Sequence, residues 1–163
     1  MPIAEGLVRR INLLVQYVVI AQFSVLVTVV AAAVFWRYVL NDSIVWAEEL
    51  SRYLFVWISF LGGGLGVGTN IHVGVDSIVE LLPERPKLVV QIAVELLIVA
   101  FTTVLIWVGW QFMMFGMRSD ALLLPIKMGH VYMAVPAGGV VMLLNVLLNV
   151  ARHVRTLVER KPV

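Results

Sequence analysis

Long apolar segments dominate the pattern of hydrophobic and polar positions along this chain. The segments 11–36 and 53–75 carry no Asp, Glu, Lys or Arg, and the segments 88–117 and 121–151 carry one such residue each. Runs of this length exceed the roughly 18 apolar residues that indicate a membrane-spanning helix. The pattern predicts an all-α integral membrane protein with four transmembrane helices in a bundle, forming one domain over residues 1–163. The expected spans are about 11–36, 46–71, 88–115 and 122–150.

The composition supports a membrane protein and excludes several other classes. Hydrophobic residues make up 61% of the chain and charged residues 13%, and the mean hydropathy is +0.99. A soluble domain is usually about one quarter charged. The chain has no cysteine, which excludes disulfides, a thiol nucleophile and a cysteine metal site. Arg9 and Arg10 precede an apolar run that is too long for a cleaved signal peptide, so we expect an uncleaved first span.

The basic residues predict the orientation of the spans. Four spans place both termini on one side of the membrane, together with eight of the twelve Lys and Arg residues. Because cytoplasmic segments carry an excess of Lys and Arg, we expect both termini on the cytoplasmic side of the membrane. The net charge of +2 is explained by this clustering, and we expect no nucleic-acid partner. The four residues left on the other side are Arg37, Arg52, Arg118 and Lys127.

The second span begins with an unusual charged stretch, SIVWAEELSRYLFVW at 43–57. On a helical projection we place Trp46, Tyr53 and Trp57 on one face, and the charges of Glu48, Glu49 and Arg52 on the other. The aromatic residues suit the boundary between lipid and water. The stretch predicts either an interfacial helix before the second span or a continuation of that span with its charges in water.

The charged face continues towards the middle of the membrane through small residues. Ser59, Gly63 and Gly66 follow Arg52 at helical spacing, within the run GGGLGVG at 62–68. Small residues at this spacing let a second helix backbone approach closely, and in lipid such packing drives association. A phosphate-binding loop is excluded because the glycines have neither a flanking strand nor a P-loop lysine. The face therefore predicts a helix-packing surface with a charged outer end.

The same region resembles the small membrane subunit of tripartite ATP-independent periplasmic (TRAP) transporters, the DctQ-type family. The resemblance covers residues 37–83 well, and a weaker match continues near the fourth span. One departure is the stretch GVGTNIH at 66–72, where family members often have a basic residue before the histidine. The matching residues are Arg37-Tyr38, Trp46-Ala47-Glu48-Glu49, Arg52, Leu61-Gly62, His72, Asp76 and Leu82-Pro83, followed by Pro125, Tyr132, Pro136 and Gly138.

The resemblance implies a non-catalytic scaffold subunit of a sodium-coupled secondary transporter. Such systems import organic anions, including dicarboxylates, sialic acid and sulfonates, which a periplasmic binding protein delivers. The implied partners are a large multispan membrane subunit, which carries the substrate and sodium sites, the binding protein and membrane lipids. We expect the surface that meets the large subunit or lipid to contain Arg37, Trp46, Glu48, Glu49, Arg52, Ser59, Gly63 and Gly66.

Two charged residues fall inside the predicted spans. Helical rise places Glu95 about 12 Å from the cytoplasmic end of its span and Lys127 about 9 Å from the opposite end, so they are too far apart to pair. Lys127 is expected to extend outward to water. Gln16 and Asn145 lie at a depth similar to that of Glu95, and we expect Gln16, Glu95 and Asn145 to form an intramembrane polar layer. An intramembrane carboxylate also leaves an alternative, in which the chain is an autonomous small ion or drug carrier that uses Glu95.

The histidines do not predict a cofactor. A bis-histidine haem needs two imidazoles at similar depth, and we expect His72 at the inner end of the second span, His130 towards the outer side and His153 in the cytoplasmic tail. We therefore expect no cofactor, no metal, no substrate-binding residues and no catalytic residues, and a membrane enzyme or haem protein is the least favoured class.

Overall fold

Four long helices and one short helix make up the part of the chain that the structure, a computed structural model, describes, residues 2–68 and 84–159. The helices are α1 (Pro2–Val39), α2 (Val45–Gly68), α4 (Glu84–Gly116), α5 (Met128–Tyr132) and α6 (Ala134–Glu159). Within these residues, four stretches are long and apolar enough to cross a membrane: α1 from Glu5, α2, α4 from Val90, and α5 with α6 to Arg155. The predicted all-α fold with four spans is confirmed. His72 and the predicted end of the second span at 69–71 lie outside the described residues.

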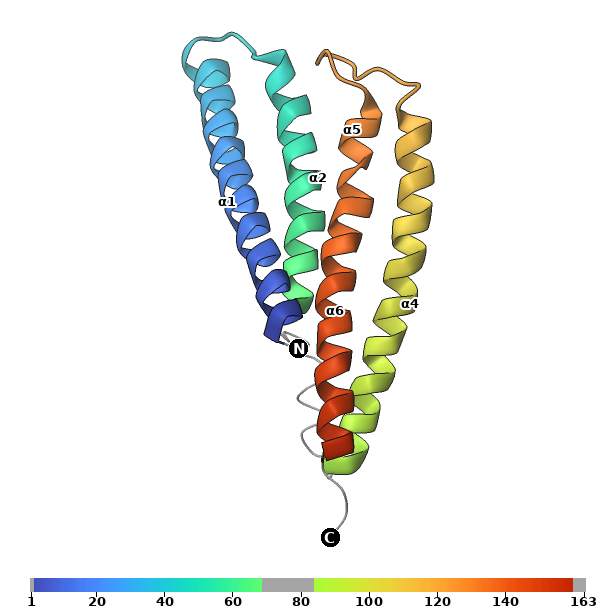
Figure 1. Ribbon diagram of the computed structural model, residues 1–163. Coiled ribbons are helices and arrows are strands. Elements are labelled where there is room, and N and C mark those ends of the chain that lie inside the picture. The colour runs from blue at the N-terminus through green and yellow to red at the C-terminus, as the bar shows by residue number, and fades with distance from the viewer. Residues whose placement is uncertain (1, 69–83, 160–163) are drawn as a thin grey trace.

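The helices pack as a row in which α2 and α6 lie between α1 and α4 (Figure 1). In the most apolar stretch of the span Met128–Arg155, 44% of the residues are buried, whereas no residue is buried in the corresponding stretch of α1. The first turn of α1 and the last turns of α6 lie towards the same end of the bundle (Figure 1). Thus α6 forms the core, and α1 is a peripheral helix whose sides face the surroundings of the chain.

Two consecutive glycines of α6 allow this row to pack closely. A Cβ at Gly138 would overlap the backbone of Phe60 in α2, and a Cβ at Gly139 would lie 2.7 Å from Ile106 Cγ1 in α4. Because small residues let helix backbones meet in lipid, these two positions hold α6 against both of its neighbours.

The helix that carries the charged stretch is continuous with the second span. Asn41 adopts a left-handed conformation with φ of 51°, which asparagine tolerates better than most residues. The amide N–H of Ala47 donates to Ile44 O at 3.1 Å as α2 begins. Since α2 runs as one helix from Val45 to Gly68, the charged stretch is the first part of a membrane-spanning helix and not a separate interfacial helix.

The fourth span begins later than the predicted residue 122. Residues 121–127 form a loop, closed by an antiparallel bridge between Asp120 and Lys127. The helix starts at Met128 and breaks near Met133 before α6, since Pro136 has no N–H to donate to the preceding turn. The apolar residues of the loop extended the predicted span because hydropathy alone does not distinguish an apolar loop from a helix.

Candidate functional site at the second span

The outer end of α2 carries an ion pair with α1. Arg37 Nη2 lies 2.7 Å from Glu48 Oε1, and the two side chains are 55% and 63% exposed. The ion pair of Glu48 therefore joins α2 to the neighbouring helix α1. Arg37, Glu48 and Arg52 also border an open groove of about 420 Å³ between α1 and α2.

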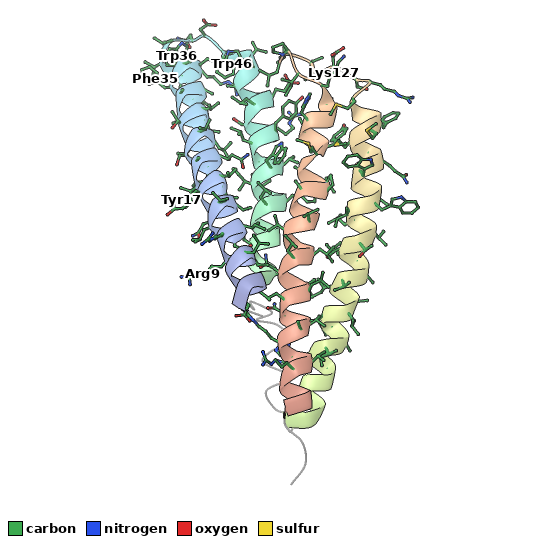
Figure 2. All side chains as sticks on the ribbon, viewed as in Figure 1. Arg9, Tyr17, Phe35, Trp36, Trp46 and Lys127 are labelled. Atoms are coloured by element: carbon green, nitrogen blue, oxygen red, sulfur yellow. The ribbon has the colours of Figure 1, made fainter. Side chains whose placement is uncertain are left out.

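Aromatic side chains mark the same end of the molecule. Figure 2 shows Phe35, Trp36 and Trp46 at the end that also holds Lys127, with Arg9 towards the opposite end. Trp36 and Trp46 are 40% and 47% exposed. Amphipathic rings of this kind concentrate at membrane–water interfaces, so this end lies at one membrane boundary.

Glu49 does not lie on the exposed face with Glu48 and Arg52, as the helical projection had it. Its residue surface is 8% exposed. The carboxylate accepts the backbone N–H groups of Leu122 at 2.8 Å on Oε1, and of Leu123 and Leu124 at 2.8 and 2.9 Å on Oε2. Residues four apart on a helix share a face, and Tyr53 Oη accordingly donates to Glu49 Oε1 at 2.5 Å. The interface assignment of Glu49 is therefore wrong, because this side chain is enclosed by its own chain.

The bonds to Glu49 determine the shape of the loop between α4 and α5. Three successive amide N–H groups converge on one carboxylate, an arrangement that satisfies backbone donors which would otherwise be unpaired. The loop directs apolar side chains outward, and Leu122 is 89% exposed. Lys127 Nζ lies 2.5 Å from Asp120 Oδ1, and Lys127 belongs to this loop and not to the interior of a span as predicted.

The small residues of α2 divide between two faces. A Cβ at Gly64 would lie 2.8 Å from Gly138 O, and one at Gly68 would lie 2.6 Å from Asn145 Oδ1, so both face α6. A Cβ at Gly63 or Gly66 would have nothing within 4 Å. Ser59 and Gly63 are exposed, and Gly66 is half-buried. Hence the Gly63 and Gly66 positions leave room for a helix from outside the chain.

Asn145 belongs to a polar contact between α1 and α6. Its amide donates to Asn12 Oδ1 at 3.1 Å and accepts from Asn12 Nδ2 at 2.7 Å. It also donates to Gly64 O at 3.2 Å. Gln16, one turn beyond Asn12, borders a cavity together with Asn145.

Glu95 lies in a different polar contact, between α4 and α6. Its residue surface is 5% exposed, and Oε1 lies 2.9 Å from His153 Nδ1. Oε2 is buried and has no hydrogen-bond partner. The structure thus joins Asn145 to Asn12 and Glu95 to His153, and within the described part of the chain no hydrogen bond joins Glu95 to Gln16 or Asn145. The single polar layer is not formed, because α6 turns Asn145 towards α1 and His153 towards α4.

The sequence did not predict four partners in these hydrogen-bonded contacts: Tyr53, Asn12, His153 and the loop at 122–124. Tyr53 could have been found from its spacing of four residues from Glu49, and Asn12 from its spacing of four from Gln16. His153 and the loop carry no local signal, since their partners are distant in sequence. Within residues 2–68 and 84–159, no group of three or more His, Cys, Asp or Glu side chains is placed to hold a metal.

Comparison with known proteins places these features in a family. Residues 26–156 match the model of the DctQ component of tripartite ATP-independent periplasmic transporters. The sialic acid TRAP transporter small permease protein SiaQ of Vibrio cholerae is 24% identical over 85% of this chain and 80% of its own length. The C4-dicarboxylate TRAP transporter small permease protein DctQ of Rhodobacter capsulatus is 37% identical over 61% of this chain and 45% of its own length.

A third relative is a much longer protein. The isethionate TRAP transporter permease protein DctMQ of Oleidesulfovibrio alaskensis is 30% identical over 68% of this chain, a match that covers 18% of that protein. All three relatives are named as permease proteins of transporters. Since the family match spans most of the chain, including α2 and α6, this protein is a member of the DctQ component family of TRAP transporters.

Proposed function

We propose that this chain is a non-catalytic scaffold that anchors the large membrane subunit of a sodium-coupled transporter of organic anions. A periplasmic binding protein delivers the anion to that transporter. The relatives are named for sialic acid, C4-dicarboxylate and isethionate, which are carboxylates or a sulfonate. Their shared chemistry supports an organic anion as the substrate class.

The open face of α2 is the observation that carries this proposal. Ser59, Gly63 and Gly66 follow one another at helical spacing, and α6 packs against the adjacent face of the same helix. In lipid, a helix gains little from burying ordinary apolar side chains, whereas small residues allow the close contact that favours association. We assign this face, with Arg37, Trp46, Glu48 and Arg52 at its outer end, to the large subunit.

The proposed orientation places both termini in the cytoplasm of the bacterial cell. The aromatic end with Trp36, Trp46 and Lys127 then lies at the periplasmic boundary, and Arg9 lies at the cytoplasmic boundary (Figure 2). This arrangement follows the excess of basic residues at the end with the termini.

Co-purification with the large subunit tests the docking face. At Gly63 an added Cβ would have no atom from another part of the chain within 4 Å, and Gly63→Leu also raises helix propensity. We therefore attribute a loss of association in this variant to the partner. Ala100→Leu on the exposed side of α4 is the matched control. We expect Gly63→Leu to reduce recovery of the large subunit several-fold and Ala100→Leu to leave it unchanged. Equal recovery for both variants and the unaltered chain would exclude this face.

The alternative is an autonomous carrier that uses Glu95. It predicts uptake by this chain alone in liposomes, whereas a scaffold gives none. Glu95→Gln in the complete transporter separates the two functions further. We expect transport to persist in that variant, because Glu95 contacts His153 near one end of the bundle and serves packing between α4 and α6.

A further inference from the structure

An open cavity of about 560 Å³ lies between α1, the end of α2 and α6, at the end of the bundle that carries Arg9. Its volume falls within the usual range for small-molecule sites. Two polar stripes at helical spacing face each other across it. The polar lining includes Arg9, Asn12 and Gln16 from α1 and Asn145, Asn149 and Arg152 from α6.

The charge of the lining favours an anion. Arg9 and Arg152 contribute two positive charges, and Glu5 contributes one negative charge. Arg152 Nε lies 3.4 Å from Glu5 Oε1, and both side chains are exposed. Because the charges of this pair offset each other, the net charge of the lining is positive and comes from Arg9. Guanidinium groups are well suited to phosphate, which they can bind through two parallel hydrogen bonds.

The depth profile of the lining favours an amphipathic ligand over a free phosphate. Gln16 lies seven residues beyond Arg9, and Asn145 seven before Arg152, so the carboxamides lie about 10 Å deeper than the guanidinium groups. The hydrogen bonds between Asn12 and Asn145 hold those two amides in place. The same cavity is also lined by Leu13 and Leu148. Cations therefore lie at the mouth, carboxamide side chains lie further in, and apolar side chains lie beside them.

We propose that this cavity binds the phosphate-bearing head group of an anionic membrane lipid, with its glycerol and ester groups near the carboxamides. Basic pockets between membrane helices on the cytoplasmic side commonly bind such head groups. Only the choice of the cytoplasmic leaflet rests on the orientation proposed above. The site is separate from the docking face of α2, so loss of lipid binding and loss of large-subunit binding are distinguishable.

Native mass spectrometry of the full-length chain tests this site. The chain is titrated with phosphatidylglycerol or with phosphatidylcholine, and the number of retained lipids is counted. We expect preferential retention of phosphatidylglycerol. At about 1 kcal/mol per basic residue, Arg9→Gln and Arg152→Gln each weaken retention about fivefold, and the double variant about thirtyfold. Arg10→Gln is the matched control, because it removes the same charge from an exposed position that does not line the cavity.

A second variant separates the cavity from general charge attraction. Leu13 is 44% exposed, so Leu13→Trp is expected to fold while it fills part of the cavity at constant charge. It should reduce phosphatidylglycerol retention, with helix content checked by circular dichroism. Unchanged retention in the double arginine variant, or an equal loss in Arg10→Gln, would overturn the proposed site. Displacement of the lipid by an equal concentration of inorganic phosphate would overturn a lipid as the source of the phosphate.

Discussion

The two faces of α2 differ in what they contact, although their residues alternate along the sequence. The outward residues are exposed or surrounded by open space, whereas the inward residues contact the α4–α5 loop or α6. A helix turns by about 100° per residue, so a single step along the chain moves a side chain from one environment to the other. The inward positions therefore determine the fold of this chain, and the outward positions are the ones that we propose for association. The three adjacent outward and inward pairs are Glu48 and Glu49, Arg52 and Tyr53, and Gly63 and Gly64.

The largest effect on stability is expected at Gly64. In Gly64→Leu, the added Cβ would lie 2.8 Å from Gly138 O, and the new side chain would also meet Val141. To accommodate it, α2 and α6 must move apart. Overpacking of this kind typically costs about 1–3 kcal/mol. Thermal unfolding in detergent should show a lower Tm for Gly64→Leu and no loss for Gly63→Leu. Equal losses in the two variants would mean that the faces do not differ.

The next effect is expected at Glu49. Glu49→Ala removes the acceptor for three backbone N–H groups, so the loop at 122–124 should open. Hydrogen exchange measured by mass spectrometry should become faster at these amides by at least about tenfold. Glu48→Ala is the control and should leave their exchange unchanged. Protection that persists in Glu49→Ala would show that the carboxylate does not hold the loop.

Tyr53→Phe is expected to have a smaller effect, because it removes one hydrogen bond and keeps the ring. The hydroxyl lies 2.5 Å from Glu49 Oε1, and loss of a hydrogen bond of this kind typically costs about 1 kcal/mol. For a chain of this length that corresponds to a Tm lower by about 2–4 °C. Arg52→Gln on the outward face should not change the Tm, and a larger loss there than in Tyr53→Phe would contradict the comparison.

The smallest effect is expected at the ion pair of Arg37 and Glu48. Both side chains are more than half exposed, and exposed ion pairs contribute less than about 1 kcal/mol. A double-mutant cycle with Arg37→Gln and Glu48→Gln should give a coupling energy below about 0.5 kcal/mol, decreasing with added salt. A coupling of several kcal/mol would assign these residues to the fold of the chain instead of its outer surface.

Much of the fold followed from the sequence because the bilayer imposes strong constraints. Apolar runs of sufficient length predicted four spans, and the part of the chain that the structure describes contains four candidate spans. The family resemblance at Arg37 to Pro83 was also confirmed, and the chain is a component of a transporter and not an enzyme. Hydropathy depends on how long a segment stays apolar, so it predicted the transmembrane spans correctly in number. It also placed the start of the fourth span too early, in the apolar loop before Met128.

The site was less predictable, because its contacts join distant parts of the chain. Nothing near Glu49 in sequence indicates that three amides of a later loop will surround it. The positions of Gln16, Glu95 and Asn145 along their helices predicted a similar depth in the membrane for all three. Depth does not specify which neighbouring helix a side chain faces. Asn145 forms hydrogen bonds with Asn12, and Glu95 contacts His153, because the order of the helices in the row places different neighbours beside them.

The carboxylate that organises the α4–α5 loop also has a consequence for biogenesis. Glu49 is translated before Leu122, Leu123 and Leu124, so the acceptor of these hydrogen bonds is synthesised before its donors. The loop at 122–124 can therefore form these three hydrogen bonds only once α2 lies beside it.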